Sequence, residues 1–229
     1  FFMFKALVSP NYIYLGDEFV HWRSTNDIIK TGELYNPNPL LPTSAYYPGL
    51  QNVTVALSTL SGLNVYHSLL LTLWAAQLVL VLSLFLMFEY ITDSHWIAGL
   101  GTVFYMANAN YIFYGQQFGY ESMSLPTMAL VIYLLCHRAM EGRTTNIRDY
   151  TAVIIFLILS IVPTHHMTSY ALIAFLMVWT LAVFLERRGL LKLIDRLVEW
   201  VEGILHFIGN RIAPLRWGMN QVSLLDFRL

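Results

Sequence analysis

Charged side chains are scarce in this 229-residue sequence: they make up 12% of it, and the formal net charge is −1. A soluble domain carries about 25% charged residues. Half of that share, together with long stretches free of Asp, Glu, Lys and Arg, indicates a chain that lies in a lipid bilayer. The chain also lacks a cluster of Lys and Arg outside the loops between helices, and nucleic-acid binding needs such a cluster. We therefore expect a membrane protein with no nucleic-acid partner.

Cysteine is nearly absent as well, since Cys136 is the single cysteine of the chain. One cysteine cannot form an internal disulfide, and at the end of an apolar run it is expected to be a buried small side chain rather than a nucleophile. The sequence contains no Gly-rich phosphate loop, no Gly-x-Ser-x-Gly elbow and no Cys-x-x-Cys-His motif. These absences give no support to a serine hydrolase of that type or to a c-type haem protein.

Long uncharged runs begin after residue 64 and are long enough to form membrane spans, which need about 20 apolar residues. The last of them is expected to break at Pro163 into a hairpin, because arginines precede it and follow it. Loops rich in Lys and Arg stay cytoplasmic, so an even number of spans must separate the two flanks. The runs cover residues 65–88, 96–120, 122–136 and 151–185.

The predicted fold is therefore all-α: a polytopic transmembrane helix bundle with a long, partly helical first extracytoplasmic loop. The loop covers residues 16–64 and contains four prolines between residues 37 and 48, while residues 17–29 can form a surface helix. The same topology places the polar segments 116–121 and 163–169 on the outer face with this loop.

Five segments follow from this topology. The expected order is the end of a truncated first transmembrane helix, the outer loop, a bundle of about five helices, an amphipathic helix and a tail. The amphipathic helix either lies at the cytoplasmic interface or connects to a missing domain. We expect the chain to be the N-terminal part of a larger protein. The boundaries are 1–15, 16–64, 65–186, 190–212 and 213–229.

Asp17 and Glu18 open the outer loop as adjacent carboxylates. Adjacent side chains point in different directions, so the two are expected to have different tasks. One can accept a proton from an acceptor hydroxyl, and the other can hold a metal, a sugar hydroxyl or an arginine. Two ordinary solvated carboxylates are an equally good interpretation. His21 would share a helix face with Asp17, and Arg23 follows two residues later.

Two further polar spots are candidates for the same site. His165 and His166 lie in the turn after Pro163, where imidazoles can bind a phosphate as donors or bind a divalent metal. A pair of histidines in a turn is more often a satisfied polar turn. Glu121 begins a span from the outer side, where it can stabilise the helix start or reach into a cavity.

A set of short motifs resembles the polytopic glycosyltransferases of the GT-C superfamily. The motifs occur in a consistent order between residues 15 and 186, and the first outer loop opens with Gly-Asp-Glu. They are Gly-Asp-Glu at 16–18, Gly-Glu-Leu-Tyr-Asn-Pro at 32–37, Tyr-Tyr-Pro-Gly at 46–49, Phe-Gly-Tyr-Glu-Ser at 118–122 and Thr-His-His-Met-Thr-Ser-Tyr at 164–170.

The resemblance implies a membrane enzyme that transfers a hexosyl or pentosyl group from a polyprenyl-phosphate donor. The acceptor would be a lipid, a glycan or a protein, at the extracytoplasmic face of the plasma membrane. The general base maps to Asp17, with Glu18 as the alternative. Some members use a divalent metal such as Mg or Mn, and possible ligands here are Asp17, His165 and His166. The substrate- or phosphate-binding candidates are His21, Arg23, Glu121, His165 and His166.

Two rival functions fit the composition. In a transporter or permease, Asn108, Asn110 and Glu121 would line a path, although the chain has few charges within its spans. A non-catalytic membrane scaffold would retain the fold without the chemistry.

Overall fold

The computed structural model describes residue 13 and residues 16–115, 117–140 and 147–189 of the chain. Every regular element in these ranges is a helix, so the predicted all-α class is confirmed there. The chain divides into two compact units, Phe1–Leu172 and Ile173–Leu229. Apart from residue 13, the helix end expected at 1–15 lies outside the described residues, as do the amphipathic helix at 190–212 and the tail at 213–229.

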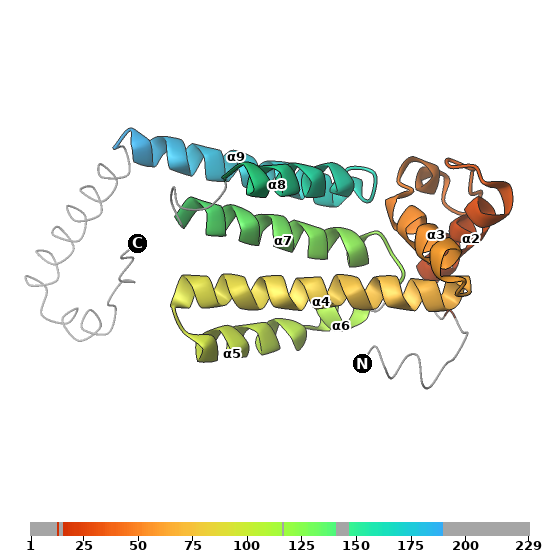
Figure 1. Ribbon diagram of the computed structural model, residues 1–229, viewed down its shortest axis with the longest axis horizontal. Coiled ribbons are helices and arrows are strands. Elements are labelled where there is room, and N and C mark those ends of the chain that lie inside the picture. Colours follow the sequence, from red (N-terminus) through yellow and green to blue (C-terminus); the bar gives the residue numbers. More distant parts are fainter. Residues whose placement is uncertain (1–12, 14–15, 116, 141–146, 190–229) are drawn as a thin grey trace, which may run out of the picture. The chain divides into compact units, whose positions relative to one another are not determined.

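Residues 16–61 form a small helical lobe (Figure 1). Helix α2 spans Gly16–Thr31, the 3-10 turn η1 spans Pro42–Tyr46, and α3 spans Gly49–Ser61. The surface helix predicted over 17–29 corresponds to α2, whereas α3 was not predicted. Helix α3 follows Pro48 at its N-cap and ends at Gly62, whose φ of 72° is the left-handed conformation that glycine adopts without strain.

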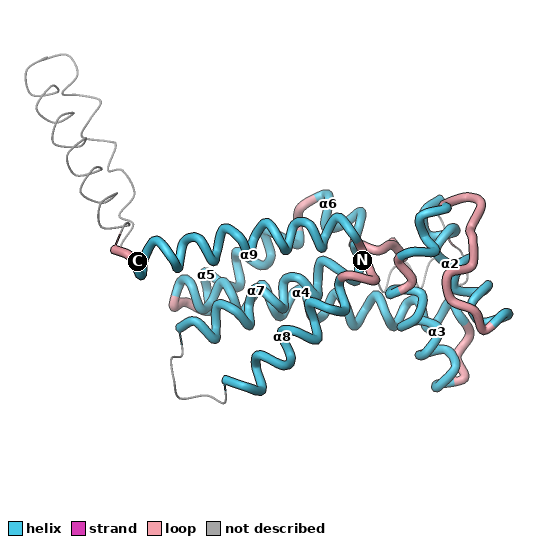
Figure 2. The backbone as a smooth tube through the Cα atoms, turned by 90° about the horizontal axis from the view of Figure 1, so that it is seen from above, coloured by secondary structure: helices cyan, strands magenta, loops and turns pink. Residues whose placement is uncertain are grey.

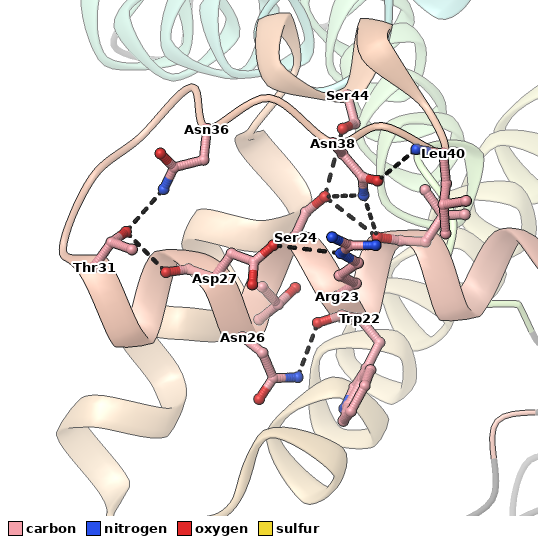
Figure 3. Close-up of polar contacts among 12 residues, drawn as sticks. Trp22, Arg23, Ser24, Asn26, Asp27, Thr31, Asn36, Asn38, Leu40 and Ser44 are labelled. Atoms are coloured by element: carbon pink, nitrogen blue, oxygen red, sulfur yellow. Dashed lines mark hydrogen bonds and ion pairs between the residues drawn. The ribbon is translucent and has the colours of Figure 1, made fainter.

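One buried side chain fastens the proline-rich connection between α2 and α3 to α2 (Figure 3). The amide nitrogen of Asn38, a residue 1% exposed, donates to the Val20 carbonyl at 3.1 Å and to Ser24 Oγ at 2.9 Å. Its Oδ1 accepts the Leu40 N–H at 3.0 Å. Because these bonds satisfy Asn38 fully, a segment without regular structure keeps a fixed course over α2.

The remaining described helices are α4 to α9 (Figure 2). Within the first unit, α4 packs against α5 and α7, and α7 packs against α8. The lobe contacts α4 through α2 and α3. The bounds are α4 Val65–Thr92, α5 His95–Met106, α6 Ala109–Tyr114, α7 Glu121–Met140, α8 Ile147–Ile161 and α9 His166–Arg187.

Two of the described helices, α4 and α9, are long and apolar enough to cross a membrane. The 28 residues of α4 extend over about 42 Å, more than the roughly 30 Å of a bilayer's hydrocarbon core. The Asn64 side chain caps its start by accepting the His67 N–H at 2.9 Å. The run predicted as one span over 96–120 is instead divided between α5 and the six-residue α6, because Asn108 ends one helix and caps the next.

The break predicted at Pro163 is confirmed. Helix α8 ends at Ile161, and α9 begins at His166. The N–H groups of Thr164 and His165 both donate to the Ile161 carbonyl, at 2.9 and 3.0 Å. This tight turn holds His165 and His166 at the start of α9.

Large apolar side chains are exposed on the helices of the first unit. Trp96 and Phe104 on α5 are 84% and 75% exposed, and Phe156 on α8 is 71% exposed. Apolar surface of this extent favours contact with lipid or with another protein over contact with water.

Gly49 lies where the lobe contacts the α8–α9 turn, and a substitution there tests that contact. Its N–H donates to the Pro163 carbonyl at 2.9 Å, and a Cβ at this position would lie 2.4 Å from Thr164 Oγ1 and 2.9 Å from Thr164 Cα. We expect Gly49→Ala to destabilise the fold by about 1–3 kcal/mol, because the overpacked contact must open. Thermal unfolding in detergent, followed by tryptophan fluorescence, measures this as a lower Tm.

The matched control is Gly99→Ala in α5, where a Cβ would meet no atom within 4 Å. Alanine favours a helix over glycine, so this variant should keep or slightly raise the Tm. An unchanged Tm in Gly49→Ala would show that the lobe does not pack tightly on the α8–α9 turn.

Candidate functional site

The Glu18 carboxylate joins two parts of the chain that are a hundred residues apart. It lies in the first turn of α2 and is 1% exposed. Its Oε1 accepts the backbone N–H of Phe118 at 2.9 Å. A buried carboxylate is costly unless it is hydrogen-bonded, so this bond holds the turn before α7 against α2.

Asp17 has a different environment from its neighbour. It is exposed, as expected for a residue rotated by about 100° from Glu18 around the helix. Burial lowers the pKa of His21, one helical turn further along, and the charge of Asp17 opposes part of that lowering. The structure therefore assigns the two carboxylates different surroundings: Glu18 is enclosed in a backbone contact, and Asp17 is available to solvent or a substrate.

His21 is a buried residue of α2 and is 4% exposed. Its Nδ1 lies 3.2 Å from Gln51 Nε2 of α3, and its ring centroid lies 4.2 Å from that of Tyr120. Because the amide nitrogen is a donor, Nδ1 accepts and the imidazole proton resides on Nε2. Burial lowers the pKa of His21 to about 4, with Asp17 opposing this effect and His165 adding to it. His21 is therefore neutral at physiological pH.

Tyr120 connects His21 to the α8–α9 turn. Its ring stacks on that of His165 with a centroid distance of 5.8 Å. Burial raises the pKa of Tyr120 to about 12, opposed by the nearby side chains of Gln51 and Ser44. The hydroxyl makes no hydrogen bond of good geometry to either of them. It is a neutral phenol that can donate one hydrogen bond.

Both nitrogens of His165 have polar neighbours. Nδ1 lies 2.8 Å from Thr168 Oγ1, and Nε2 lies 3.4 Å from Glu121 Oε1. Thr168 Oγ1 is in turn 2.9 Å from Ser124 Oγ of α7. Burial lowers the pKa of His165, and His166 adds to this effect while Glu121 opposes it. Neutral His165 with its proton on Nε2 completes a chain of hydroxyl, imidazole and carboxylate groups.

Four of the predicted residues therefore lie within one network together with Tyr120. We call this network the histidine cluster and define it as His21, Tyr120, Glu121, His165 and His166. These contacts bring residues of the segment 16–64 together with the segments 116–121 and 163–169, whereas the membrane side on which they lie stays a prediction. His166 joins through the ring of His165 at 5.3 Å.

Arg23 is the predicted residue that points elsewhere. Its Nε lies 3.7 Å from Asp27 Oδ2 on the same helix, and both side chains are more than one third exposed (Figure 3). Such an exposed pair contributes less than about 1 kcal/mol, so the guanidinium can exchange partners easily. The sequence contains no Lys or Arg from residue 31 to residue 137, and Arg23 and Lys30 are therefore the described cations of the lobe.

The residues suggested as metal ligands do not assemble into a ligand set. Among the described residues there is no group of three or more His, Cys, Asp and Glu side chains placed to hold a metal ion. His165 already uses both ring nitrogens, toward Thr168 and Glu121. A Mg or Mn site at Asp17, His165 and His166 has no geometric support within these residues.

Sequence reasoning missed Gln51, Tyr47 and Thr168. Gln51 contacts the His21 ring, Tyr47 packs 4.9 Å from the His166 ring, and Thr168 contacts His165. The available signal was position: Tyr47 lies in the Tyr-Tyr-Pro-Gly motif, and Gln51 follows it by two residues.

Comparisons with protein-family models, with curated proteins and with solved structures found no match to this chain.

His21 gives the site a measurable pH dependence. Its pKa is lower in the folded protein than the ordinary value of 6.5, so the unfolded chain takes up the proton first. The contribution of neutral His21 to the free energy of unfolding is fully present above pH 6.5 and is lost as the pH falls to about 4. The free energy of unfolding falls by about 3 kcal/mol over this range. Thermal unfolding at pH 7.5, 5.5 and 4 should show a smaller fall in Tm for His21→Asn than for wild type.

His67→Asn removes an exposed histidine from the start of α4 and is the matched control. It should keep the wild-type pH dependence. An identical pH dependence in His21→Asn and wild type would mean that His21 is not buried as a neutral imidazole.

The two carboxylates of α2 can be separated by stability alone. Glu18→Ala leaves the buried Phe118 N–H without this acceptor and should lower stability by about 1–3 kcal/mol. Asp17→Ala removes an exposed side chain and should cost less than about 1 kcal/mol. The difference in Tm between the two variants measures the effect, and equal values would contradict the buried contact.

Proposed function

We propose that this protein is an integral-membrane glycosyltransferase that resembles the GT-C superfamily and transfers a sugar from a polyprenyl-phosphate donor to an acceptor hydroxyl. The observation that carries the proposal is the placement of Asp17. It is an exposed carboxylate on the first turn of α2, and its neighbour Glu18 binds that turn to the residues before α7. A general base must be both accessible and fixed in position, and Asp17 meets both requirements.

In the proposed step, Asp17 accepts the proton of the acceptor hydroxyl. The hydroxyl oxygen then bonds to the anomeric carbon of the sugar. The bond from that carbon to the phosphate oxygen breaks, and the polyprenyl phosphate departs with the electron pair. A single displacement of this kind inverts the configuration at the anomeric carbon.

The departing phosphate needs hydrogen-bond donors or cations. Lowered pKa values make His21 and His165 neutral, so each can offer an N–H but no positive charge. Arg23 is two residues from His21 and therefore lies on another face of α2, where it pairs weakly with Asp27. We assign to Arg23 the positive charge that attracts the phosphate to the lobe, and to His21 and His165 the N–H groups that the histidine cluster offers.

The site would face the extracytoplasmic side of the plasma membrane. In this proposal α4 and α9, which are long and apolar enough to cross a membrane, are two of the spans of a multi-pass protein. The lobe meets the N-terminal part of α4, so the site lies where a lipid-linked sugar and an aqueous acceptor can meet.

Asp17→Asn tests the proposal. Removing the base should reduce transfer by about 10²–10⁴-fold, while the Tm stays near the wild-type value because the side chain is exposed. The assay uses purified protein in nanodiscs, synthetic short-chain polyprenyl-phosphate glucose or mannose as donor, and a lipid and glycan extract as acceptor. Glu33→Gln, which changes an exposed carboxylate just after the same helix, is the matched control.

Full transfer by Asp17→Asn would exclude Asp17 as the base. Absence of transfer by wild type with either donor, under conditions where the protein is folded, would count against glycosyl transfer from these lipids.

Transport is a second candidate because Asn110 and Glu121 both line a single cavity in the first unit. A transporter would accumulate its substrate in sealed vesicles without forming a new glycosidic bond. Uptake that survives Asp17→Asn and is lost in Glu121→Gln would favour transport over transfer.

A further inference from the structure

The cavity beside the histidine cluster has a volume of about 290 Å³ and lies among α4, α5, α6 and α7. This is near the lower end of the range of about 300–1,000 Å³ for ligand pockets, so it suits one small ring or a similar group. The described residues that line it include two tyrosines, two amides and a carboxylate: Tyr105, Tyr111, Gln77, Asn110 and Glu121.

The polar side chains that line the cavity are suited to a ligand that donates hydrogen bonds. The Glu121 carboxylate can only accept, and the amides of Gln77 and Asn110 offer carbonyl oxygens. Gln77 is 5% exposed, and its Oε1 has no hydrogen-bond partner among the described residues. A buried amide oxygen without a partner is costly, and a rotation of the Gln77 side chain that turned this oxygen toward the cavity would let a bound hydroxyl group relieve that cost.

The aromatic groups of the wall are suited to the apolar face of a ring. Tyr105 and Tyr111 stand edge to face with centroids 5.5 Å apart, and Leu80 and Leu125 line the same cavity. A pyranose has one face of C–H groups that packs on aromatic rings and a rim of hydroxyls that donate to carboxylates and amides.

The charge of the cavity excludes anions. No Lys or Arg occurs in the sequence between Lys30 and Arg138, and every described residue that lines the cavity belongs to this interval. Glu121 would repel a phosphate, a sulfate or a uronate. The polyprenyl phosphate therefore does not enter this cavity.

We propose that the cavity binds the ring of a neutral sugar and discriminates against anionic sugars. Glu121 also lies 3.4 Å from His165, so a sugar bound to this carboxylate would reach the edge of the histidine cluster. The absence of a side chain at Gly119 leaves room for the Glu121 carboxylate, since a Cβ at residue 119 would lie 3.3 Å from Oε2 of Glu121. The assignment of the bound sugar to the donor or to the acceptor rests on the proposed function. The binding of a neutral sugar in this cavity does not depend on that function.

The test is saturation-transfer NMR with wild-type protein in nanodiscs. Sugar detergents are avoided because their headgroups would compete. The probes are methyl β-glucoside, methyl α-mannoside, sodium glucuronate and tetramethylammonium. We expect at least one neutral glycoside to bind and glucuronate not to bind. Tyr111→Leu and Gln77→Leu should each weaken glycoside binding by about tenfold.

Tyr46→Leu, an exposed tyrosine in the lobe, is the matched control and should bind like wild type. Glu121→Gln should admit glucuronate, because the repulsion is removed. Equal binding of glucuronate and glycoside by wild type, a preference for tetramethylammonium, or no effect of Tyr111→Leu and Gln77→Leu would each overturn the proposal.

The transfer assay separates the two proposals. Glycoside binding by wild type without Asp17-dependent transfer supports the sugar pocket and removes the proposed function. Asp17-dependent transfer without glycoside binding by wild type supports the proposed function and removes the sugar pocket. Where both hold, a raised KM for the donor alone in Tyr111→Leu assigns the pocket to the donor sugar, and a raised KM for the acceptor alone assigns it to the acceptor. If Tyr111→Leu leaves the KM for the donor and the KM for the acceptor unchanged, neither the donor sugar nor the acceptor sugar occupies the cavity, and its assignment to this reaction is overturned.

Discussion

The buried hydrogen bond from the Phe118 amide to the Glu18 carboxylate is the constraint on which the candidate site depends. The lobe and the start of α7 are far apart in sequence, and a charged acceptor enclosed by protein must find donors wherever the fold offers them. Meeting that requirement places Tyr120 next to the His21 ring, and Tyr120 then meets His165. At the other edge, the Gly49 N–H on the Pro163 carbonyl brings the α8–α9 turn against the same lobe.

Burial of the imidazoles decides the electrostatics of the site. Because desolvation lowers the pKa of His21 and of His165, these two imidazoles contribute directed hydrogen bonds without positive charge. Neutral imidazoles next to carboxylates orient polar groups but attract an anion poorly. In the proposed transfer, the positive charge for the leaving phosphate is therefore assigned to Arg23, which the exposed pair with Asp27 holds only weakly.

Much of the fold follows from patterns that a sequence displays, and part of the site does not. The 28-residue α4 and the break at Pro163 are visible as uncharged runs, a proline and flanking arginines. Helix α3 was hidden because prolines just before it predict irregular structure, whereas Pro48 occupies the N-cap, where a missing N–H is harmless. The sequence also cannot tell which of two adjacent carboxylates is buried, because a long-range contact with Phe118 decides it.

Glu121 is the residue that both proposals share, and its position explains how they could act together. One oxygen faces His165, and the side chain also lines the cavity beside Tyr111. Because a carboxylate has two oxygens, Glu121 can accept a hydrogen bond from a sugar hydroxyl through one oxygen and from the His165 N–H through the other. Glu121 would in this way hold a sugar in the proposed pocket and fix the orientation of the His165 ring at the same time. The same negative charge would keep the proposed leaving phosphate out of the pocket, so the two proposals assign the sugar ring and the phosphate to different sides of this carboxylate.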